Sequence, residues 1–214
     1  MTSSGTPERL VFVGDSITDA GRDRGDVTSL GDGYVSLVAA DLPKAAVVNL
    51  GIGGNRAVDL EERWEREVAP TAPDVLTVYV GVNDTWRRFD AGDPTGAEAF
   101  EATYRRLLAR VPDSPRLVLV EPFLLPVRPE QEAWLEDLEG KRDVVARLAA
   151  EFGAALVPLH SLLTRAARDA GAAALAPDGV HPTPPASRII ADAWLTAYAD
   201  VAQTILDNDV RLQG

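Results

Sequence analysis

The chain has 214 residues and contains no cysteine, one methionine and two histidines. Without cysteine it can form neither disulfides nor thiolate metal sites, and a cysteine nucleophile is excluded. The scarcity of histidine is equally informative, because imidazole is the side chain that most readily exchanges protons near neutral pH. Any histidine base in this protein must be His160 or His181.

Long apolar runs are also missing. The first residues, MTSSGTPERL, lack the basic segment and the apolar stretch of about 7 to 15 residues that mark a signal peptide. Elsewhere no apolar run approaches the length of a membrane span. We therefore expect a cytoplasmic protein that does not bind a membrane.

Basic residues are outnumbered by acidic ones, with 21 Lys and Arg against 33 Asp and Glu and a formal net charge of -12. Nucleic acids and anionic membranes are bound through clustered Lys and Arg, so this balance argues against both partners. A neutral or locally bound substrate fits better. With 46% apolar and 25% charged residues, the composition is that of an ordinary globular protein, and the length predicts one α/β domain over residues 1–214.

The stretch from Leu10 to Asp19, LVFVGDSITD, organises the rest of the chain. A continuous apolar run that ends at a glycine is typical of a strand buried on both faces of a parallel sheet. Ser16 then follows the carboxyl end of that strand, where open α/β sheets bind their ligands. Taken alone, the Gly-Asp-Ser turn is equally consistent with an ordinary loop and a helix N-cap. The functional interpretation depends on three later stretches.

Strand and helix patterns alternate along the remainder of the chain. We expect further strands at residues 45–50, 75–80, 116–121 and 154–159. Helices are expected at residues 34–41, 57–68, 95–110, 130–152 and 186–206, with an Ala-rich helix before Gly171. This alternation implies βαβ crossovers and a five-stranded parallel sheet with helices on both faces, which is a three-layer α/β/α sandwich.

The predicted strand ends and loops carry the parts of an acyl-transfer site. Carboxyl ends of parallel strands share one edge of the sheet, so residues far apart in the sequence can meet there. Serine is a weak nucleophile until a base removes its proton, and His181 is the candidate base for Ser16. Asp178 lies three residues before His181, close enough for its carboxylate to bond the second ring nitrogen and fix the tautomer.

Attack on a carbonyl places negative charge on its oxygen, which requires hydrogen-bond donors that already point at it. Three candidates stand at the predicted strand ends. They are the backbone N–H of Ser16, the backbone N–H of Gly51, which no side chain shields, and the side-chain amide of Asn83. Together they predict an oxyanion hole.

Four blocks of the chain resemble the ordered motifs of the SGNH, or GDSL, hydrolase superfamily. They are GDS at residues 14–16, NLGIGGN at 49–55, GVND at 81–84 and DGVHP at 178–182. The likeness spans nearly the whole chain, and four blocks in order are a more specific signal than any one of them. The resemblance implies a flavodoxin-like sheet, esterase activity without a metal or other cofactor, and the roles given above to Ser16, Gly51, Asn83, Asp178 and His181.

Further stretches are similar to the intracellular acetylxylan esterases of that superfamily: GDSITDAGRDR, GDGYV, GVNDTWRRFD and EPFLLP. Those enzymes remove acetyl groups from xylo-oligosaccharides and form homo-oligomers, so the resemblance implies an acetylated sugar as substrate and a homo-oligomer as the assembly. The chain departs from them at Pro177, where they tend to carry a tryptophan. The alternatives are a thioesterase or lysophospholipase of the same superfamily and a carbohydrate-binding protein without catalysis.

Asp15 and Asp19 raise the question of a magnesium site of the phosphatase type. Such sites use two aspartates separated by a single residue, together with further carboxylates, and this spacing differs. We therefore expect no metal, and we expect Asp15 to brace the turn by accepting backbone N–H bonds. The glycines of GIGGN do not meet the G-x-G-x-x-G spacing of dinucleotide-binding loops, so no cofactor is expected.

Trp86 and Arg87 closely follow Asn83 and are candidate substrate-binding residues, one as a sugar platform and the other as a clamp. Asp15, beside the nucleophile, is placed in the same group. A tryptophan near a cleft is equally consistent with simple packing. His160 has no carboxylate three or four residues before it, so we expect an ordinary loop residue and not a second base.

Overall fold

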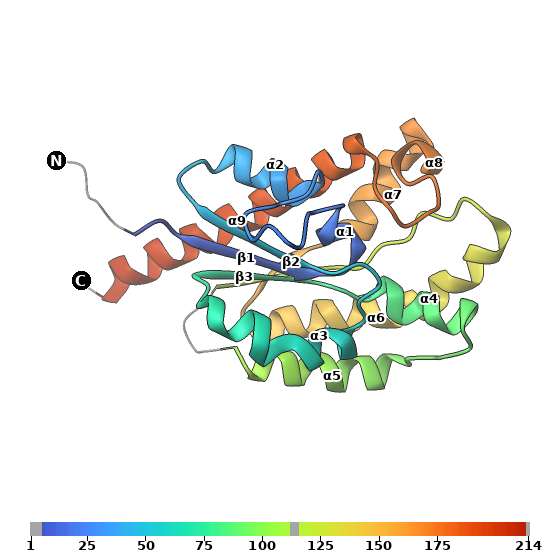
Figure 1. Ribbon diagram of the computed structural model, residues 1–214, viewed down its shortest axis with the longest axis horizontal. Coiled ribbons are helices and arrows are strands. Elements are labelled where there is room, and N and C mark those ends of the chain that lie inside the picture. The colour runs from blue at the N-terminus through green and yellow to red at the C-terminus, as the bar shows by residue number, and fades with distance from the viewer. Residues whose placement is uncertain (1–5, 112–115, 213–214) are drawn as a thin grey trace.

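A five-stranded parallel sheet forms the centre of the computed structural model, which describes residues 6–111 and 116–212 (Figure 1). The strands stand in the order β2-β1-β3-β4-β5, and each neighbouring pair is parallel. Their bounds are β1 (Arg9–Gly14), β2 (Ala46–Gly51), β3 (Val75–Tyr79), β4 (Arg116–Val120) and β5 (Ala155–Val157). The predicted five-stranded sheet is confirmed.

Helices cover both faces of the sheet, so the three-layer sandwich is also confirmed (Figure 1). The face at the top of the figure carries α2 (Tyr34–Asp41), α7 (Leu159–Ala170) and α9 (Pro184–Leu212), and the other face carries α3 (Ala57–Arg63), α5 (Ala97–Ala109) and α6 (Glu132–Glu151). A hydrophobic core lies on each face of the sheet. Strand β1 contributes side chains to both, because successive side chains of a strand point to opposite faces. Leu10 and Phe12 belong to the core beneath α2 and α9, and Val11 and Val13 to the core beneath α3 and α5.

Three short helices lie near the carboxyl ends of the strands: α1 (Ser16–Asp19), α4 (Val82–Asp90) and α8 (Ala172–Leu175). Helix α4 occupies a stretch to which the sequence analysis assigns no helix. Its apolar residues Val82, Trp86 and Phe89 stand at helical spacing, so the sequence carries a signal for this helix, and its buried residues also include the polar Asn83, Asp84 and Thr85.

Several predicted helices have different bounds in the structure. The helix expected at residues 57–68 changes into a π-helical turn at Trp64–Val68. Helix α9 begins at Pro184, before the expected start, because proline is tolerated in a first helical turn, where its missing N–H has no acceptor to lose. Although α9 is long, none of the helices within residues 6–111 and 116–212 combines the length and apolar character needed to cross a membrane.

The point at which strand order reverses lies beside β1. From β1 the chain goes to β2 on one side, and the next strand, β3, lies on the other side of β1. Such a reversal leaves a crevice outside the carboxyl ends of the strands, where ligands bind in open α/β sheets. Ser16 stands at that crevice, two residues after the last residue of β1.

Candidate active site

Ser16, His181 and Asp178 form a continuous hydrogen-bonded chain at the carboxyl edge of the sheet. Ser16 Oγ lies 2.9 Å from His181 Nε2, and His181 Nδ1 lies 2.6 Å from Asp178 Oδ2. Ser16 is the first residue of α1, and Asp15 caps that helix by accepting the Ile17 N–H at 3.0 Å. The nucleophile Ser16, the base His181 and the orienting carboxylate of Asp178 are thus connected in the spatial order that acyl transfer requires.

Asp178 uses its two carboxylate oxygens differently. Oδ2 faces the imidazole, and Oδ1 accepts the backbone N–H groups of Val180 at 2.9 Å and of His181 at 2.8 Å. Burial raises the pKa of Asp178, but the hydrogen bonds from the His181 side chain and from the two backbone groups outweigh it, and the net pKa is lowered. The carboxylate is therefore ionised at neutral pH and can stabilise a protonated imidazole.

The loop that carries Asp178 and His181 is seated on the segment that follows β4. The buried Gln131 donates from Nε2 to the Asp178 carbonyl at 2.6 Å, and the Leu125 N–H donates to the Gly179 carbonyl at 2.9 Å. Gly179 has a φ of +89°, and a Cβ there would lie 2.8 Å from the Leu125 oxygen. Glycine is required at this position because the two segments approach so closely.

Two of the predicted oxyanion donors, Ser16 and Asn83, each have an N–H without an acceptor among the described residues. The N–H of Ser16 lies in the first turn of α1, where a helix offers no internal acceptor. Asn83 is buried in the first turn of α4 and donates one amide hydrogen to the Asn55 carbonyl at 3.2 Å. A primary amide has two N–H groups, so the second remains for a substrate oxygen.

The structure contradicts the third predicted donor, Gly51. Its N–H donates to Asn49 Oδ1 at 2.8 Å within the end of β2, so this amide is already used. The residue is glycine for another reason. A Cβ at this position would lie 2.2 Å from the Asp19 nitrogen, because α1 packs directly onto the end of β2.

Gly54, two residues beyond Ile52 in the same block, has the properties that Gly51 lacks. The other three amides of the turn at residues 52–55 are occupied by acceptors, whereas the Gly54 N–H has none among the described residues. Its φ of +83° suits glycine. The turn lies beside the nucleophile, since a Cβ on Gly53 would stand 3.8 Å from the Ser16 Cβ.

Two buried polar side chains that the sequence analysis did not single out tie these segments together. Asn49 Nδ2 donates to the carbonyl of Thr18 at 2.7 Å and to that of Leu30 at 2.8 Å. Arg63 of α3 donates to the Leu50 carbonyl and to Asn55 Oδ1, both at 2.8 Å. A polar residue inside a buried strand was the available signal for Asn49. Arg63 stands in a charged helical run that gave none.

The structure gives no support to the predicted contact of Asp15 with the substrate. The residue is fully buried beneath Ser16, with Oδ1 bonded to the Ile17 N–H. The expectation that it braces the turn is confirmed by that bond. Burial is the largest influence on this group and raises its pKa to about 7.

Trp86 and Arg87 lie close to the catalytic chain. The Trp86 ring is half-buried, 6.1 Å from the His181 ring between centroids and 5.5 Å from that of Trp134. Arg87 pairs with Asp90 at 2.6 Å, and its guanidinium lies 3.8 Å from the place that a Cβ on Gly54 would occupy. Their part in substrate binding stays a prediction.

Asp19, the second residue of the magnesium alternative, is occupied by protein partners. It accepts the Gly53 N–H at 2.9 Å and pairs with Arg24 and, at 3.7 Å, with Arg22. It thereby anchors the turn at residues 52–55 to α1. Within the described residues, no group of three or more His, Asp or Glu side chains is arranged to hold a metal ion.

His160 lies in the first turn of α7 and not in a loop. Its backbone N–H donates to Glu121 at 3.0 Å, and its Nδ1 is buried without a hydrogen-bond partner among the described residues. Burial, followed by the nearby charge of Arg142, lowers the pKa of His160 to about 4. The ring is therefore neutral over the pH range in which an esterase base must work, and His181 is the histidine bonded to Ser16.

The lowered pKa of His160 predicts that the free energy of unfolding decreases as the solution becomes acidic. The unfolded chain binds a proton at His160 below about pH 6.5 and the folded chain only near pH 4, so the contribution of His160 is complete above pH 6.5 and is lost as the pH falls toward 4. We expect wild type to lose about 1 to 3 kcal/mol of unfolding free energy relative to His160→Gln over that range. Urea unfolding of both proteins at several pH values measures the difference.

Taking this difference between proteins is necessary because Asp15 and Asp84 act in the opposite direction. Burial raises the pKa of each to about 7, so their contribution to stability grows as the pH falls from 7 toward 3.8. Both aspartates are unchanged in the variant, and their contribution cancels. Parallel curves for wild type and His160→Gln would contradict the assignment.

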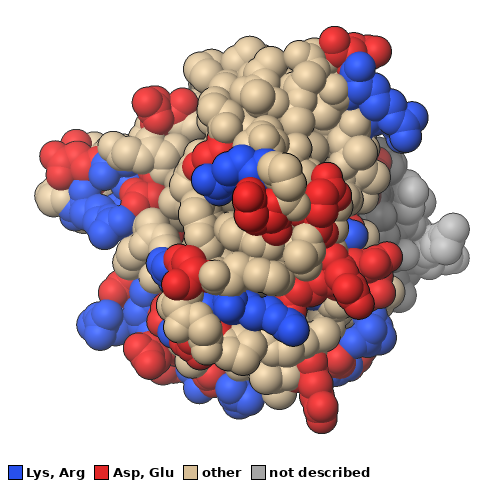
Figure 2. Space-filling view, turned by 90° about the vertical axis from the view of Figure 1, so that its right-hand side faces the viewer, with Lys and Arg blue, Asp and Glu red and all other residues tan. Residues whose placement is uncertain are grey.

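A cavity of about 190 Å³ opens onto Ser16 and His181. It is smaller than the roughly 300 to 1,000 Å³ of typical small-molecule sites, which favours a small substrate. Figure 2 looks onto this edge of the molecule and shows acidic and basic side chains interspersed over it, with a largely uncharged upper part. An ester without net charge suits such a surface.

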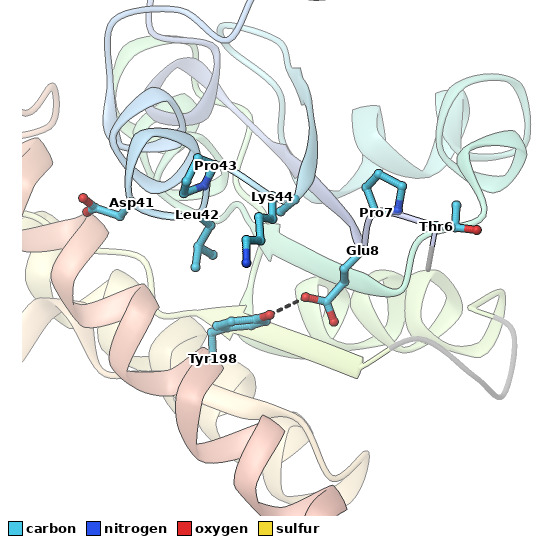
Figure 3. A pocket seen from close by; sticks show the side chains of 9 residues that line it. Thr6, Pro7, Glu8, Asp41, Leu42, Pro43, Lys44 and Tyr198 are labelled. Carbon is cyan, nitrogen blue, oxygen red and sulfur yellow. Dashed lines mark hydrogen bonds between the residues drawn. The ribbon is translucent and has the colours of Figure 1, made fainter. Parts of the chain in front are cut away.

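A larger cavity, of about 470 Å³, lies at the opposite edge of the sheet, where β1 and β2 begin (Figure 3). Its walls include Leu42, Lys44 and Tyr198, and the Tyr198 hydroxyl bonds to Glu8. Neither serine nor histidine lines it, so it lacks the pairing of nucleophile and base found at the other edge. The smaller cavity is therefore the candidate active site.

Comparison with known proteins shows the family of the chain. Residues 12–189 match the model of the GDSL-like lipase/acylhydrolase family. An acetylxylan esterase of Geobacillus stearothermophilus is 34% identical over 206 residues, which cover 89% of this chain and 94% of the relative.

Solved structures are similar over the same length. The crystal structure of the Geobacillus acetylxylan esterase has a TM-score of 0.83 at 33% identity and covers 92% of this chain and 96% of its own. A GDSL-like lipase of Parabacteroides merdae has a TM-score of 0.86 at 33% identity, covering 90% and 95% of the two chains. Three further structures of the Geobacillus enzyme are of catalytic mutants, in which a serine, an aspartate or a histidine is replaced by alanine.

Proposed function

The chain belongs to the GDSL-like lipase/acylhydrolase family and is a carboxylic ester hydrolase, and we propose that it removes acetyl groups from xylo-oligosaccharides or similar sugars. The proposal is supported most by the bonds from Ser16 to His181 and from His181 to Asp178, at 2.9 and 2.6 Å, beside a small cavity. The substrate class follows the acetylxylan esterase that matches 89% of the chain. A cytoplasmic location and a homo-oligomeric state stay predictions.

In the first half of the reaction, Ser16 Oγ attacks the ester carbonyl carbon while its proton moves to His181 Nε2. Asp178 holds the Nδ1 proton and stabilises the imidazolium that forms. The bond between the carbonyl carbon and the sugar oxygen then breaks, and His181 returns the proton to that oxygen. The sugar leaves as an alcohol, and the acetyl group stays on Ser16.

In the second half, water replaces the sugar. His181 takes a proton from the water as its oxygen attacks the acetyl carbon, and the bond to Ser16 Oγ breaks as the proton passes to that oxygen. Acetate is released and Ser16 is restored. The two halves use the same residues in reversed roles, so no cofactor enters the scheme.

The negative charge on the carbonyl oxygen is assigned to three donors: the N–H of Ser16, the N–H of Gly54 and the side-chain amide of Asn83. They are carried by α1, the turn at residues 52–55 and α4, and the proposal is supported by the approach of that turn to Ser16 and by the bond from Asn83 to Asn55. Removing one such donor costs on the order of 100- to 1,000-fold in rate in serine hydrolases. Gly54 takes the place that the sequence analysis gave to Gly51, because its N–H has no acceptor in the described part of the chain, whereas the Gly51 N–H is bonded to Asn49.

A substrate panel tests the proposal. We expect kcat/KM to fall by about 10-fold or more from p-nitrophenyl acetate to p-nitrophenyl octanoate, because the relative that matches 89% of this chain is an esterase for acetyl groups. Acetylated xylo-oligosaccharides should release acetate, which an acetate assay measures.

The same substrate panel also tests the competing functions. A preference for octanoyl esters would indicate a lysophospholipase, and a preference for acyl thioesters would indicate a thioesterase. Failure of a serine-directed phosphonate to label the protein, together with binding of xylo-oligosaccharides, would indicate a carbohydrate-binding protein without catalysis.

A further inference from the structure

Asp32 lines the same cavity as Ser16 and His181, although the catalytic scheme does not use it. We propose that Asp32 binds the sugar, by accepting a hydrogen bond from a free hydroxyl next to the acetylated position. This inference rests on the proposed function and adds a residue that determines specificity. It names the substrate as a partly acetylated sugar with at least one free neighbouring hydroxyl.

The backbone of Asp32 is held in place from both sides. Its N–H donates to the Ala20 carbonyl at 3.0 Å, just after the end of α1. The flanking glycines show how closely this loop approaches α1. A Cβ on Gly31 would lie 2.5 Å from the Asp19 oxygen, and one on Gly33 would lie 2.5 Å from the Ala20 Cβ. The carboxylate is thus carried on a position fixed relative to Ser16.

The Asp32 carboxylate makes no bond that stabilises the described part of the chain. Asp32 is exposed, and no hydrogen bond or ion pair joins its side chain to another described residue. It does not cap α2, whose N-cap is Gly33 without a side-chain hydrogen bond. By contrast, Asp19, Asp178 and Arg87 around the same site are each bonded to a protein partner. Asp32 therefore presents unused acceptor oxygens to whatever enters the cavity.

The chemistry of the reaction places the alcohol part of the ester in this cavity. The leaving oxygen must stand near His181, because this residue returns the proton to it. His181, Pro182 and Pro184 line the cavity together with Asp32 and Ser187. A sugar ring matches that lining, since its C–H groups can pack against proline and its hydroxyls can donate to a carboxylate.

An ionised acceptor makes a stronger hydrogen bond than a neutral one, and it also repels an anionic group. We therefore expect Asp32→Ala to lower kcat/KM for a mono-acetylated methyl xyloside with free neighbouring hydroxyls by about 10- to 100-fold. Turnover of p-nitrophenyl acetate, which has no hydroxyl, should stay within about twofold of wild type. Asp32→Asn, which keeps one acceptor oxygen, should recover part of the loss.

The substrate can be changed as well as the protein. An analogue whose free hydroxyls are methylated cannot donate, so wild type should lose activity on it while Asp32→Ala shows no further loss. Asp169→Ala is the matched control, because Asp169 is an exposed aspartate on α7 outside the cavity. It removes the same charge and should leave both substrates unaffected.

The possible results separate the two proposals. Equal activity of wild type and Asp32→Ala on the xyloside, or an equal loss on the xyloside and on p-nitrophenyl acetate, would overturn the role of Asp32 and leave the esterase function intact. If wild type hydrolyses p-nitrophenyl acetate but releases no acetate from any acetylated sugar, the carbohydrate substrate and the role of Asp32 both fail.

Discussion

Ser16→Ala is expected to lower ester hydrolysis by about 10³- to 10⁶-fold while the protein stays folded. The variant removes the only atom that can form the acyl intermediate and leaves the oxyanion donors in place, so a small residual rate is expected. The hydroxyl makes one hydrogen bond, to His181, on the rim of the site, and its loss exposes no buried partner. Initial rates with p-nitrophenyl acetate and acetylated xylo-oligosaccharides measure the effect, and circular dichroism checks the fold.

Ser161 provides the matched control for this variant. It is an exposed serine on α7 whose hydroxyl bonds to the Pro158 carbonyl, and it lies outside the catalytic cavity. Ser161→Ala should therefore retain wild-type rates. Normal turnover by Ser16→Ala would exclude Ser16 as the nucleophile, and phosphonate labelling followed by peptide mapping would then identify the residue that is.

Asp178→Asn is expected to lower kcat by about 10²- to 10⁴-fold with little change in stability. Asparagine can keep one oxygen for the Val180 and His181 N–H groups, so the loop geometry is retained. Its amide nitrogen then faces His181 Nδ1 as a donor, which favours the tautomer that carries its proton on Nε2. In that tautomer the ring cannot take a proton from Ser16.

The comparison of Asp178→Asn with Asp178→Ala separates orientation from charge. Alanine also removes the acceptor for the two backbone N–H groups, so this variant should lose stability as well as rate, whereas asparagine should lose rate alone. Thermal unfolding and kcat, measured on both variants, test this difference. A rate for Asp178→Asn within tenfold of wild type would show that the carboxylate does not orient the imidazole.

The strands and the catalytic chain could be predicted because they depend on patterns that a sequence displays. Apolar runs such as residues 10–13 are buried on both faces of the sheet, and each of the runs after them begins a new strand of the same sheet. The geometry of parallel strands then brings Ser16 and His181 to one edge without any knowledge of the loops. The fold and the catalytic chain could therefore be predicted from the sequence.

The glycine whose N–H belongs to the oxyanion hole could not be chosen from the sequence in this way. Gly51 and Gly54 stand in one short block, and composition does not say which amide is already bonded. That depends on Asn49, whose side chain accepts the Gly51 N–H and also donates to the Thr18 carbonyl of α1. The burial of Asp15 was missed for a similar reason, because a polar residue buried through a specific bond leaves no hydrophobic pattern. The helix that contains Asn83 did have a signal in the sequence, since Val82, Trp86 and Phe89 stand at helical spacing.

Asn49 has a practical consequence for anyone who wishes to redesign this enzyme. Its side chain donates to the carbonyls of Thr18 and Leu30 and so holds both ends of the long surface segment between them against the end of β2. The middle of that segment, Gly25 to Thr28, is exposed and can be exchanged or lengthened without moving its two anchored ends. Libraries that vary this segment could introduce new substrate contacts beside the site while the nucleophile keeps its place.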